Sequence, residues 1–402
     1  MRQNGDPMSK QNYKSTVAAC CLGYVTNAAA GNLAALFFVI FRETLELSLT
    51  QVTLLVTVSY IVQLAVDIIS TKLVDRMGYR RSAITAHSLI ASGFISMAAL
   101  PSFLPPFAGL MIADIIYSSG AGMNELVVSP VIEACPAPDK HSLMSFIHSV
   151  YCFGTVAVIL ITTGALSLFG RESWRIICCM WTILPVCGII AFSRVPLYSM
   201  TEEGGSMPLR KLLSKKIFWL FMILMFAAGA AEMAMAQWAS AFAESGLGVS
   251  KAVGDLAGPC MFSLFMGISR LLRAKFDFGT DLLSLMIGCG ILCTAAFLMS
   301  ALASNPVLAL AGCGICGLSV GILWPGVYST AGELCPDGGT AMFAVIALAG
   351  DIGCSGGPTL VGFVSGAFGD DLQKGMLAAA VFPIILITAA IFCRSMAKKN
   401  KT

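Results

Sequence analysis

The chain has 402 residues, of which 57% are hydrophobic and 12% are charged, and its mean hydropathy is +0.83. Ordinary globular domains contain about 45–50% apolar residues. The excess here lies in recurring apolar runs of about 18 residues or more, which excludes a soluble multidomain protein and predicts helices that cross about 30 Å of hydrocarbon. The alternation over about 10 residues that is typical of a transmembrane β-barrel is absent.

Apolar runs separated by polar breaks predict twelve membrane-spanning helices. We expect them at residues 15–41, 51–73, 82–100, 106–131, 142–169, 174–195, 215–242, 250–272, 281–302, 306–331, 341–366 and 374–395. The run from Val17 to Phe41 is too long for the apolar segment of a signal peptide and has no small-residue cleavage site. We therefore expect an all-α integral membrane protein without a cleavable signal peptide.

Lysines and arginines fall unequally on the two sides of these spans. If the N-terminus is cytoplasmic, twenty of the 25 cations lie on the inner side. The five on the outer side are Arg42, Arg171, Arg175, Lys251 and Lys374. This is the positive-inside distribution, which an odd number of spans would destroy. The sequence predicts a multi-pass protein of the cell membrane with both termini in the cytoplasm.

Two halves of the chain resemble each other. The segment FRETLELSLTQV from Phe41 matches FAESGLGVSKAV from Phe242 at an offset of 201, and the same offset relates Gly78 to Gly279. A further match, between EACP and ELCP, recurs at an offset of 200. Parallel repeats of this kind are typical of alternating-access transporters with a central site between the halves.

The longest polar segment, from Arg194 to Lys216, separates the two halves. We therefore predict an N-terminal six-helix half at 1–196, a cytoplasmic linker at 197–214 and a C-terminal six-helix half at 215–402.

In span 1, the polar side chains are Tyr24, Asn27 and Asn32. Tyr24 and Asn27 are three residues apart and share a helix face, whereas Asn32 points away from Asn27. We expect one asparagine, and not both, to hydrogen-bond the substrate, with Asn27 as the candidate.

The loop between spans 2 and 3 concentrates charge between two apolar blocks. Its sequence TKLVDRMGYRR contains Asp75, Arg76, Gly78, Arg80 and Arg81. An ordinary positive-inside loop explains the arginines but neither the aspartate nor the glycine. The loop resembles the signature Gly-x-x-x-Asp-Arg-x-Gly-x-Arg-Arg of the major facilitator superfamily, with Thr71 in place of the first glycine.

This resemblance covers the full chain and implies the major facilitator fold, in which two six-helix halves alternate access to a central site. It also implies a cytoplasmic gate, in which Asp75 contacts span 11 of the other half and the arginines form salt bridges. A carboxylate is stabilised by the partial positive charge at a helix N-terminus. Contacts made in only one conformation bias a two-state equilibrium.

Three segments narrow the resemblance to fucose-permease-like members. They are SPVIEACP…HSLMSFIHSVYCFG at 129–154, GAAEMAMAQWASAF at 229–242 and LAGDIGCSGGPTLVG at 348–362. The resemblance implies a sugar transporter of the proton-symport kind, but it does not transfer a particular substrate.

Polar residues of spans 4 and 5 form one candidate site for substrate and proton. Asp114 and Glu125 are eleven residues apart, so they share a helix face at about 16 Å separation. A polar stripe on a membrane helix is expected to face water rather than lipid. Glu125 and His148 are expected at similar depth, where the pair either holds a proton or joins the helices as a static clasp. Asn124 and Tyr151 lie beside them.

Span 7 carries Glu232 near its middle, followed by Gln237 and Trp238. A charged carboxylate at that depth is costly, which suits a coupling residue that is charged only when water reaches it. Glu232 and Trp238 are six residues apart and lie on different faces of a regular helix. Either the span is irregular and both side chains line a cavity, or Trp238 is an interfacial anchor near the outer surface.

Spans 8, 10 and 11 supply the remaining candidates. Trp324, beside Pro325, either presents a flat apolar face to a sugar ring or packs in the core. Asp351 lies in a glycine-rich stretch that permits close helix contact, and it is either a proton or substrate group or a cap in a broken helix. Arg270, near the inner end of span 8, either reaches the surface or binds an anion. Because no arginine is placed at mid-depth, organic anions are disfavoured.

Several other chemistries have no motif in the sequence. No Walker loop is present, and the glycines of GCGICG lack a following Lys-Ser/Thr. The 15 cysteines form no CxxC pair and are interpreted as small apolar fillers. We expect no enzymatic activity, no cofactor, no metal site and no nucleic-acid partner.

Taken together, these features predict a monomeric secondary transporter in the lipid bilayer, coupled to protons, that takes up a neutral sugar-like solute. One alternative is a proton-coupled efflux antiporter for drugs or hydrophobic compounds, in which Glu125 and Glu232 bind cations. Another, of a different class, is a membrane sensor or scaffold that does not transport.

Overall fold

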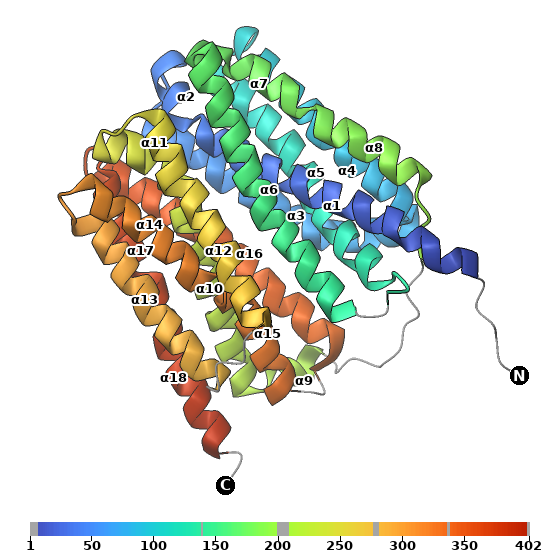
Figure 1. The fold of residues 1–402 in the computed structure, drawn as a ribbon. Coiled ribbons are helices and arrows are strands. Elements are labelled where there is room, and N and C mark those ends of the chain that lie inside the picture. Colours follow the sequence, from blue (N-terminus) through green and yellow to red (C-terminus); the bar gives the residue numbers. More distant parts are fainter. Residues whose placement is uncertain (1–6, 138–139, 199–208, 276–280, 336–337, 400–402) are drawn as a thin grey trace, which may run out of the picture. The chain divides into compact units, whose positions relative to one another are not determined.

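The computed structural model describes residues 7–137, 140–198, 209–275, 281–335 and 338–399. Every regular element in these ranges is a helix (Figure 1). Within the described residues, eleven helical stretches are long and apolar enough to cross a membrane. Helix α5, Pro106–Glu133, is a further helix of 28 residues, and it carries Asp114 and Glu125. The described part of the chain is therefore all-helical, as the sequence predicts.

The helices before the central linker cover the first six predicted spans. Their bounds are α1 Pro7–Leu36, α2 Phe38–Thr44, α3 Leu49–Met77, α4 Tyr79–Ala99, α5 Pro106–Glu133, α6 Lys140–Phe169, α7 Trp174–Trp181 and α8 Ile183–Arg194. Two short 3₁₀ helices, Leu100–Ser102 and Arg171–Ser173, follow α4 and α6. The predicted first span is interrupted at Phe37, between α1 and α2.

The helices after the linker cover the last six predicted spans. Their bounds are α9 Leu209–Leu213, α10 Lys216–Ala241, α11 Lys251–Asp255, α12 Met261–Lys275, α13 Leu282–Leu302, α14 Pro306–Val320, α15 Leu323–Leu334, α16 Gly339–Ala367, α17 Leu372–Ala379 and α18 Val381–Lys399. Two π-helical turns, Phe242–Gly246 and Leu256–Cys260, follow α10 and α11. Such turns are frequent at functional sites.

Helix boundaries recur along the chain at almost the offset of the sequence repeat. Helices α3 and α11 begin at Leu49 and Lys251, which are 202 residues apart. Helices α5 and α14 begin at Pro106 and Pro306, which are 200 residues apart. The recurrence of helix starts, including a proline at the first helical position, supports the internal repeat. Gly279, one of the matched glycines, lies outside the described residues.

The chain divides into two compact units. Unit 1 consists of Met1–Phe37 and Ile61–Glu202, and unit 2 consists of Phe38–Tyr60 and Glu203–Thr402. Helix α3 therefore begins in unit 2 and ends in unit 1. The division at 1–196, 197–214 and 215–402 stays a prediction.

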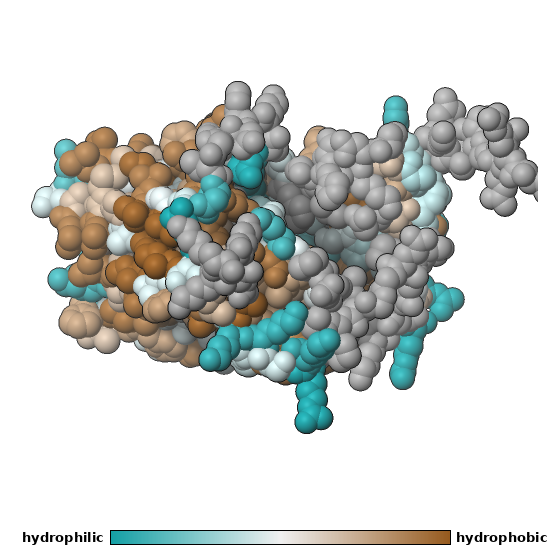
Figure 2. Space-filling view, turned by 90° about the horizontal axis from the view of Figure 1, so that it is seen from below, coloured by the Kyte–Doolittle hydropathy of each residue, from teal (hydrophilic) through white to brown (hydrophobic). Residues whose placement is uncertain are grey.

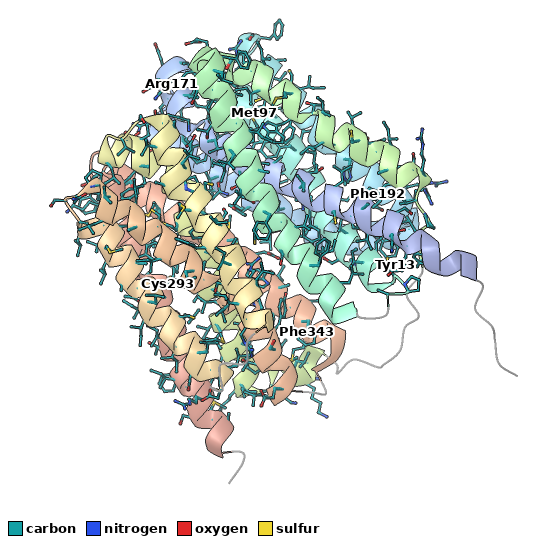
Figure 3. All side chains as sticks on the ribbon, viewed as in Figure 1. Tyr13, Met97, Arg171, Phe192, Cys293 and Phe343 are labelled. Atoms are coloured by element: carbon teal, nitrogen blue, oxygen red, sulfur yellow. The ribbon has the colours of Figure 1, made fainter. Side chains whose placement is uncertain are left out.

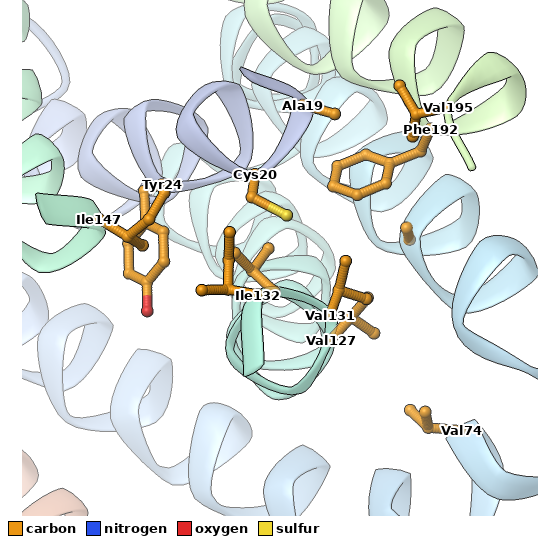
Figure 4. Packing of buried hydrophobic residues seen from close by; sticks show 12 residues of the cluster. Ala19, Cys20, Tyr24, Val74, Val127, Val131, Ile132, Ile147, Phe192 and Val195 are labelled. Atoms are coloured by element: carbon orange, nitrogen blue, oxygen red, sulfur yellow. The ribbon is translucent and has the colours of Figure 1, made fainter. Parts of the chain in front are cut away.

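Within unit 1, α1, α3, α4, α5, α6 and α8 share an apolar core (Figure 4). Its buried members are Ala19, Cys20, Tyr24, Val74, Ala83, Val127, Val128, Val131, Ile132, Ile147, Phe192 and Val195. Phe192 lies toward the end of the unit where Tyr13 is found, and Arg171 lies at the opposite end (Figure 3).

The surface of the described chain is rich in large apolar side chains. Leu168, Ile176 and Val307 are among the most exposed. Seen from one end, hydrophobic residues cover much of the described surface, with hydrophilic residues in patches between them (Figure 2). A soluble monomer rarely exposes so large an apolar surface, so this distribution agrees with contact to lipid.

In unit 2, α10 and α16 approach each other through glycines. A Cβ atom at Gly353 would clash with the carbonyl oxygen of Phe226, and one at Gly357 would clash with that of Ala230. Glycines in the sequence of span 11 predict this close contact, and the structure supplies the partner helix. Small residues allow membrane helices to pack with their backbones in contact.

We expect Gly357→Ala to lower the free energy of unfolding by roughly 1–3 kcal/mol, because the added methyl group has no space against α10. Gly288→Ala on α13 is the matched control, since nothing lies within 4 Å of a Cβ atom there. The control is expected to be neutral or stabilising, because alanine favours helix by about 1 kcal/mol over glycine. Thermal unfolding in detergent compares the two, and equal melting temperatures would contradict the close packing.

Asp281 caps the N-terminus of α13 and directly precedes the apolar membrane-spanning stretch Leu282–Leu302. Its side chain accepts hydrogen bonds from the Ser284 amide at 2.9 Å and the Ser284 hydroxyl at 2.6 Å, and it pairs with Arg394 of α18 at 2.9 Å. The hydrogen bond from the Ser284 hydroxyl, followed by that from the amide and the charge of Arg394, lowers the pKa of Asp281. A lowered pKa stabilises the fold above the unfolded-state pKa of about 3.9.

We expect Asp281→Ala to lower the free energy of unfolding by about 1 kcal/mol, and Asp281→Asn to lower it less, because asparagine retains the cap. The stability contributed by ionised Asp281 is lost as the pH falls through its folded-state pKa, below about 3.9. Unfolding measured from pH 7 to pH 3 checks both statements. A pH dependence that is unchanged in Asp281→Ala would contradict the second.

Candidate functional site

Two asparagines join α1 and α5 inside unit 1. The Asn124 side-chain amide donates to the Gly23 carbonyl at 2.9 Å and to Oδ1 of Asn27 at 2.8 Å. Asn27 in turn donates to the Ala121 carbonyl at 3.3 Å. Asn124 is fully buried, and its Oδ1 has no hydrogen-bond partner among the described residues. These amides hold the two helices together at the level of Glu125.

Glu125 follows Asn124 on the same helix, but its side chain is exposed. A charged carboxylate exposed to lipid in the middle of a membrane helix would be very costly. We therefore infer that Glu125 faces water. The side chain of His148 lies outside the described residues, so the expected pairing of Glu125 with His148 stays a prediction.

Asp114 differs from Glu125 in its surroundings. It is only 4% exposed, and Tyr117, one turn along α5, donates a hydrogen bond to its Oδ1. The expected polar stripe along α5 is therefore not uniformly open to water. The 3.6-residue helical period places the two acids on one face, but packing against neighbouring helices covers one and leaves the other exposed.

Two tyrosines lie beside the asparagines. The rings of Tyr24 and Tyr151 make an edge contact with centroids 6.4 Å apart, and the Tyr24 hydroxyl lies 3.1 Å from that of Ser129. Asn32 instead donates to the Ala28 carbonyl on its own helix at 2.8 Å. Of the two asparagines in span 1, Asn27 therefore lies with the polar cluster of α5, as its sequence position favours.

In unit 2, Glu232 of α10 faces Arg270 of α12. Arg270 Nη2 lies 3.6 Å from Glu232 Oε2, and the two side chains are 17% and 14% exposed. Arg270 Nε also donates to the Gly321 carbonyl at 3.3 Å, at the break between α14 and α15. The sequence analysis placed Arg270 near the inner end of its span. That position did not predict the ion pair with Glu232 on another helix.

Trp324 of α15 is half-buried against the α10–α16 contact. A Cβ atom at Gly350 would clash with the indole, and one at Gly229 would lie 3.1 Å from it. Gly229 is three residues before Glu232, and Gly350 directly precedes the half-buried Asp351. The indole therefore packs on two glycines that neighbour the two acids in the sequence and retains some exposed surface, and its role as a face for a sugar ring stays a prediction.

Gln237 and Trp238 lie in the packed interior of unit 2. Trp238 is fully buried, and its indole donates to the Pro358 carbonyl at 2.9 Å and packs 5.4 Å from Phe38, centroid to centroid. Gln237 donates to the Tyr60 hydroxyl at 2.9 Å. Helix α10 is regular from Lys216 to Ala241, so Trp238 points away from the face of Glu232. Trp238 is a packing residue in this structure and has no solvent-facing surface.

The first part of α3 makes polar contacts with α16, also inside unit 2. The hydroxyl oxygens of Thr57 and Thr359 are 2.7 Å apart. Nearby along the chain, Arg42 forms an ion pair with Asp370. These contacts bind the segment Phe38–Tyr60 to unit 2, although the rest of α3 belongs to unit 1.

The structure contains a buried ion pair that the sequence analysis did not predict. Lys251 Nζ lies 2.8 Å and 2.9 Å from the two carboxylate oxygens of Asp255 and 3.1 Å from the hydroxyl of Ser240. The side chains of Lys251 and Asp255 are 9% and 1% exposed. Their spacing of four residues on a helix is a signal for such a pair, but Lys251 was interpreted only as one of the outer cations.

The residues of the expected cytoplasmic gate are only partly described. The side chain of Asp75 lies outside the described residues, and Arg76 and Arg81 are exposed. Gly78 has φ 77°, a left-handed conformation that favours glycine between α3 and α4. Arg80 donates to the carbonyls of Phe192 and Val195, both at 2.7 Å, and so caps the C-terminal end of α8. The gate stays a prediction.

No group of three or more His, Cys, Asp and Glu side chains in the described ranges could hold a metal ion. The candidate sites of the two units contain carboxylates, amides, aromatic rings and the guanidinium of Arg270 inside membrane-spanning helices. This chemistry can bind a hydroxylated solute and exchange protons.

A sequence profile of the Major Facilitator Superfamily matches residues 20–358. No curated protein sequence matches the chain. Among solved structures, a D-xylose–proton symporter is similar with a TM-score of 0.74 and 14% identity, covering 95% of this chain and 97% of the other. A variant of the E. coli fucose:proton symporter FucP has a TM-score of 0.65 and 15% identity over 95% and 99% of the chains. A variant of the nucleoside transporter NupG has a TM-score of 0.75 and 14% identity over 95% and 99%.

Proposed function

The chain belongs to the Major Facilitator Superfamily, and from this we propose that it is a proton-coupled secondary transporter for a sugar-like small solute. It is a multi-pass membrane transporter with the all-helical, twelve-span fold of that family. We place it in the cell membrane with both termini cytoplasmic, because its cations favour that orientation. We also propose that it works as a monomer.

One observation carries the proposal: two carboxylates lie inside membrane-spanning helices, and their side chains are not fully covered by protein, Glu125 being exposed and Glu232 14% exposed. A carboxylate in that position is energetically costly, and such residues in membrane spans are therefore usually functional. Each lies beside groups suited to a hydroxylated solute, which are the asparagines and tyrosines of unit 1 and Trp324 of unit 2. The similarity to sugar–proton symporters supports the same solute class.

Alternating access requires that contacts made in one conformation break in the other. Helix α3 is part of unit 2 up to Tyr60 and part of unit 1 from Ile61. We propose that the segment Phe38–Tyr60 separates from α10 and α16 during the cycle, so that its contacts close one side of the transporter. Asp75, Arg76, Gly78, Arg80 and Arg81 would then act on the cytoplasmic side.

Uptake into proteoliposomes tests the function. We expect at least one labelled monosaccharide from a panel of hexoses, pentoses and their acids to accumulate when an inward proton gradient is imposed. The double variant Glu125→Gln, Glu232→Gln is expected to lose accumulation driven by the gradient, whereas Glu172→Gln in an outer loop retains it. Gradient-driven uptake by the double variant equal to the parent would remove both acids from proton coupling.

The efflux alternative is less well supported by the geometry. An antiporter for cationic drugs needs acids that are available to the cation, but Glu232 already faces the guanidinium of Arg270. The sensor or scaffold would be favoured by two results together. None of the panel would be transported, and replacing Glu125 and Glu232 would leave the cellular function of the protein intact.

A further inference from the structure

We propose that Arg270 binds a carboxylate group of the transported solute, and that the solute is a small polyhydroxylated anion such as a sugar acid. Glu232 then occupies the position of that carboxylate when the solute is absent. This inference rests on the proposed transport function and specifies its substrate class.

The geometry of the Glu232–Arg270 pair is that of a pair that can exchange partners. Its charged atoms are 3.6 Å apart, and the side chains of Arg270 and Glu232 are 17% and 14% exposed. A second ion pair among the described residues of unit 2, Lys251 with Asp255, is shorter at 2.8 Å and almost completely buried. A buried ion pair is favourable only when its geometry is tight and further hydrogen bonds satisfy it. The longer and less buried Glu232–Arg270 pair is therefore the one that a second carboxylate can enter.

The position of Arg270 does not depend on Glu232 alone. Its Nε donates to the Gly321 carbonyl at the break between α14 and α15. A Cβ atom at Gly321 would lie 2.8 Å from the Met266 carbonyl oxygen, so glycine is what allows this carbonyl to approach α12. The guanidinium is thus held from one side while Glu232 approaches it from α10. A planar guanidinium held in this way suits two-point binding of a carboxylate.

The side chain of Arg270 is largely covered by protein. An arginine that reaches the headgroups would be largely exposed at its charged end, whereas Arg270 is 17% exposed and contacts the middle of α10. The ion pair therefore brings the charge of Arg270 to the middle part of α10, although Arg270 itself lies near the end of its own helix.

An aromatic surface lies close to the pair. Trp324 follows Gly321 by three residues, and its indole packs against Gly229, three residues before Glu232. Arg270 and Trp324 are therefore positioned by the same break in the tenth span. One guanidinium and one flat apolar ring match a solute with one carboxylate and a ring or chain of C–H groups, and this favours a monocarboxylate over a dicarboxylate.

Binding of radiolabelled D-glucuronate, D-gluconate and D-glucose to the purified full chain tests the proposal. We expect the parent to bind at least one of the two acids at least tenfold more tightly than glucose. Arg270→Gln is expected to abolish this preference, and Arg270→Lys to retain part of it. Glu232→Gln is expected to bind the acid more tightly than the parent, because the competing carboxylate is gone. Arg273→Gln, on the same helix, is the matched control and should behave as the parent.

Three results would overturn the inference: glucose bound as tightly as the acids, an Arg270→Gln variant that keeps the preference, or a Glu232→Gln variant with weaker binding of the acid. Proton-driven uptake of glucose without uptake of either acid would overturn this inference and leave the proposed function intact. Failure of every sugar and sugar acid to bind or be transported would overturn both. Melting temperatures of the variants show whether a loss of binding is a loss of fold.

Discussion

Cross-linking α3 to α16 is expected to stop transport. The hydroxyl oxygens of Thr57 and Thr359 are 2.7 Å apart, so cysteines at both positions should form a disulfide with little movement. Because α3 continues into unit 1, a covalent bond at Thr57 prevents the segment Phe38–Tyr60 from leaving unit 2. We expect oxidation of Thr57→Cys, Thr359→Cys in membranes to abolish uptake of the transported sugar or sugar acid, and reduction to restore it.

The single variants Thr57→Cys and Thr359→Cys are the controls, because the chain already contains 15 cysteines that an oxidant can reach to different degrees. They should keep transport under the same oxidant. Full cross-linking of the double variant with undiminished uptake would show that this contact does not break during the cycle. The alternating-access part of the proposal would then need a different contact.

Removing the charge of Lys251 is expected to have the largest effect on stability. Lys251 and Asp255 are almost completely buried, so Lys251→Met leaves an aspartate without its counter-charge in the interior. Breaking one side of such a pair costs about 3–5 kcal/mol of unfolding free energy. We expect Lys251→Met to show a correspondingly lower melting temperature in detergent and a lower yield in membranes.

The double variant Lys251→Met, Asp255→Leu separates the ion pair from simple packing. Replacing both charges with apolar groups is often neutral or stabilising, so the double variant should recover most of the stability that the single variant loses. Ser240, which contacts both charged groups, remains in place in both. A double variant as unstable as Lys251→Met would show that the volume of Lys251, and not its charge, supports the outer end of α10.

The polar residues show which features of a membrane site can be predicted from sequence and which cannot. Glu125 and Glu232 were identified because charge is rare in apolar spans, and in the structure Glu125 is exposed whereas Glu232 is 14% exposed and faces Arg270. The position of Trp238 could not be derived from spacing alone, because burial depends on what α16 and the segment before α3 place against it. Asp114 shares a helix face with Glu125 but is covered by its neighbours. The partner of Arg270 is 38 residues away, on another helix.

The sequence alone determined the class of the molecule and predicted its twelve-span fold, because both depend on local sums of hydropathy along the chain. It also predicted the orientation, through the distribution of lysine and arginine between short loops. Only the tertiary structure decided which polar groups meet: Arg270 with Glu232, Lys251 with Asp255 and Ser240, and Asn124 with Asn27. Such meetings depend on how helices rotate and tilt when small residues, such as Gly353 and Gly357, let them pack closely. The periodicity of a single span cannot predict which polar groups of other helices its own polar groups will meet.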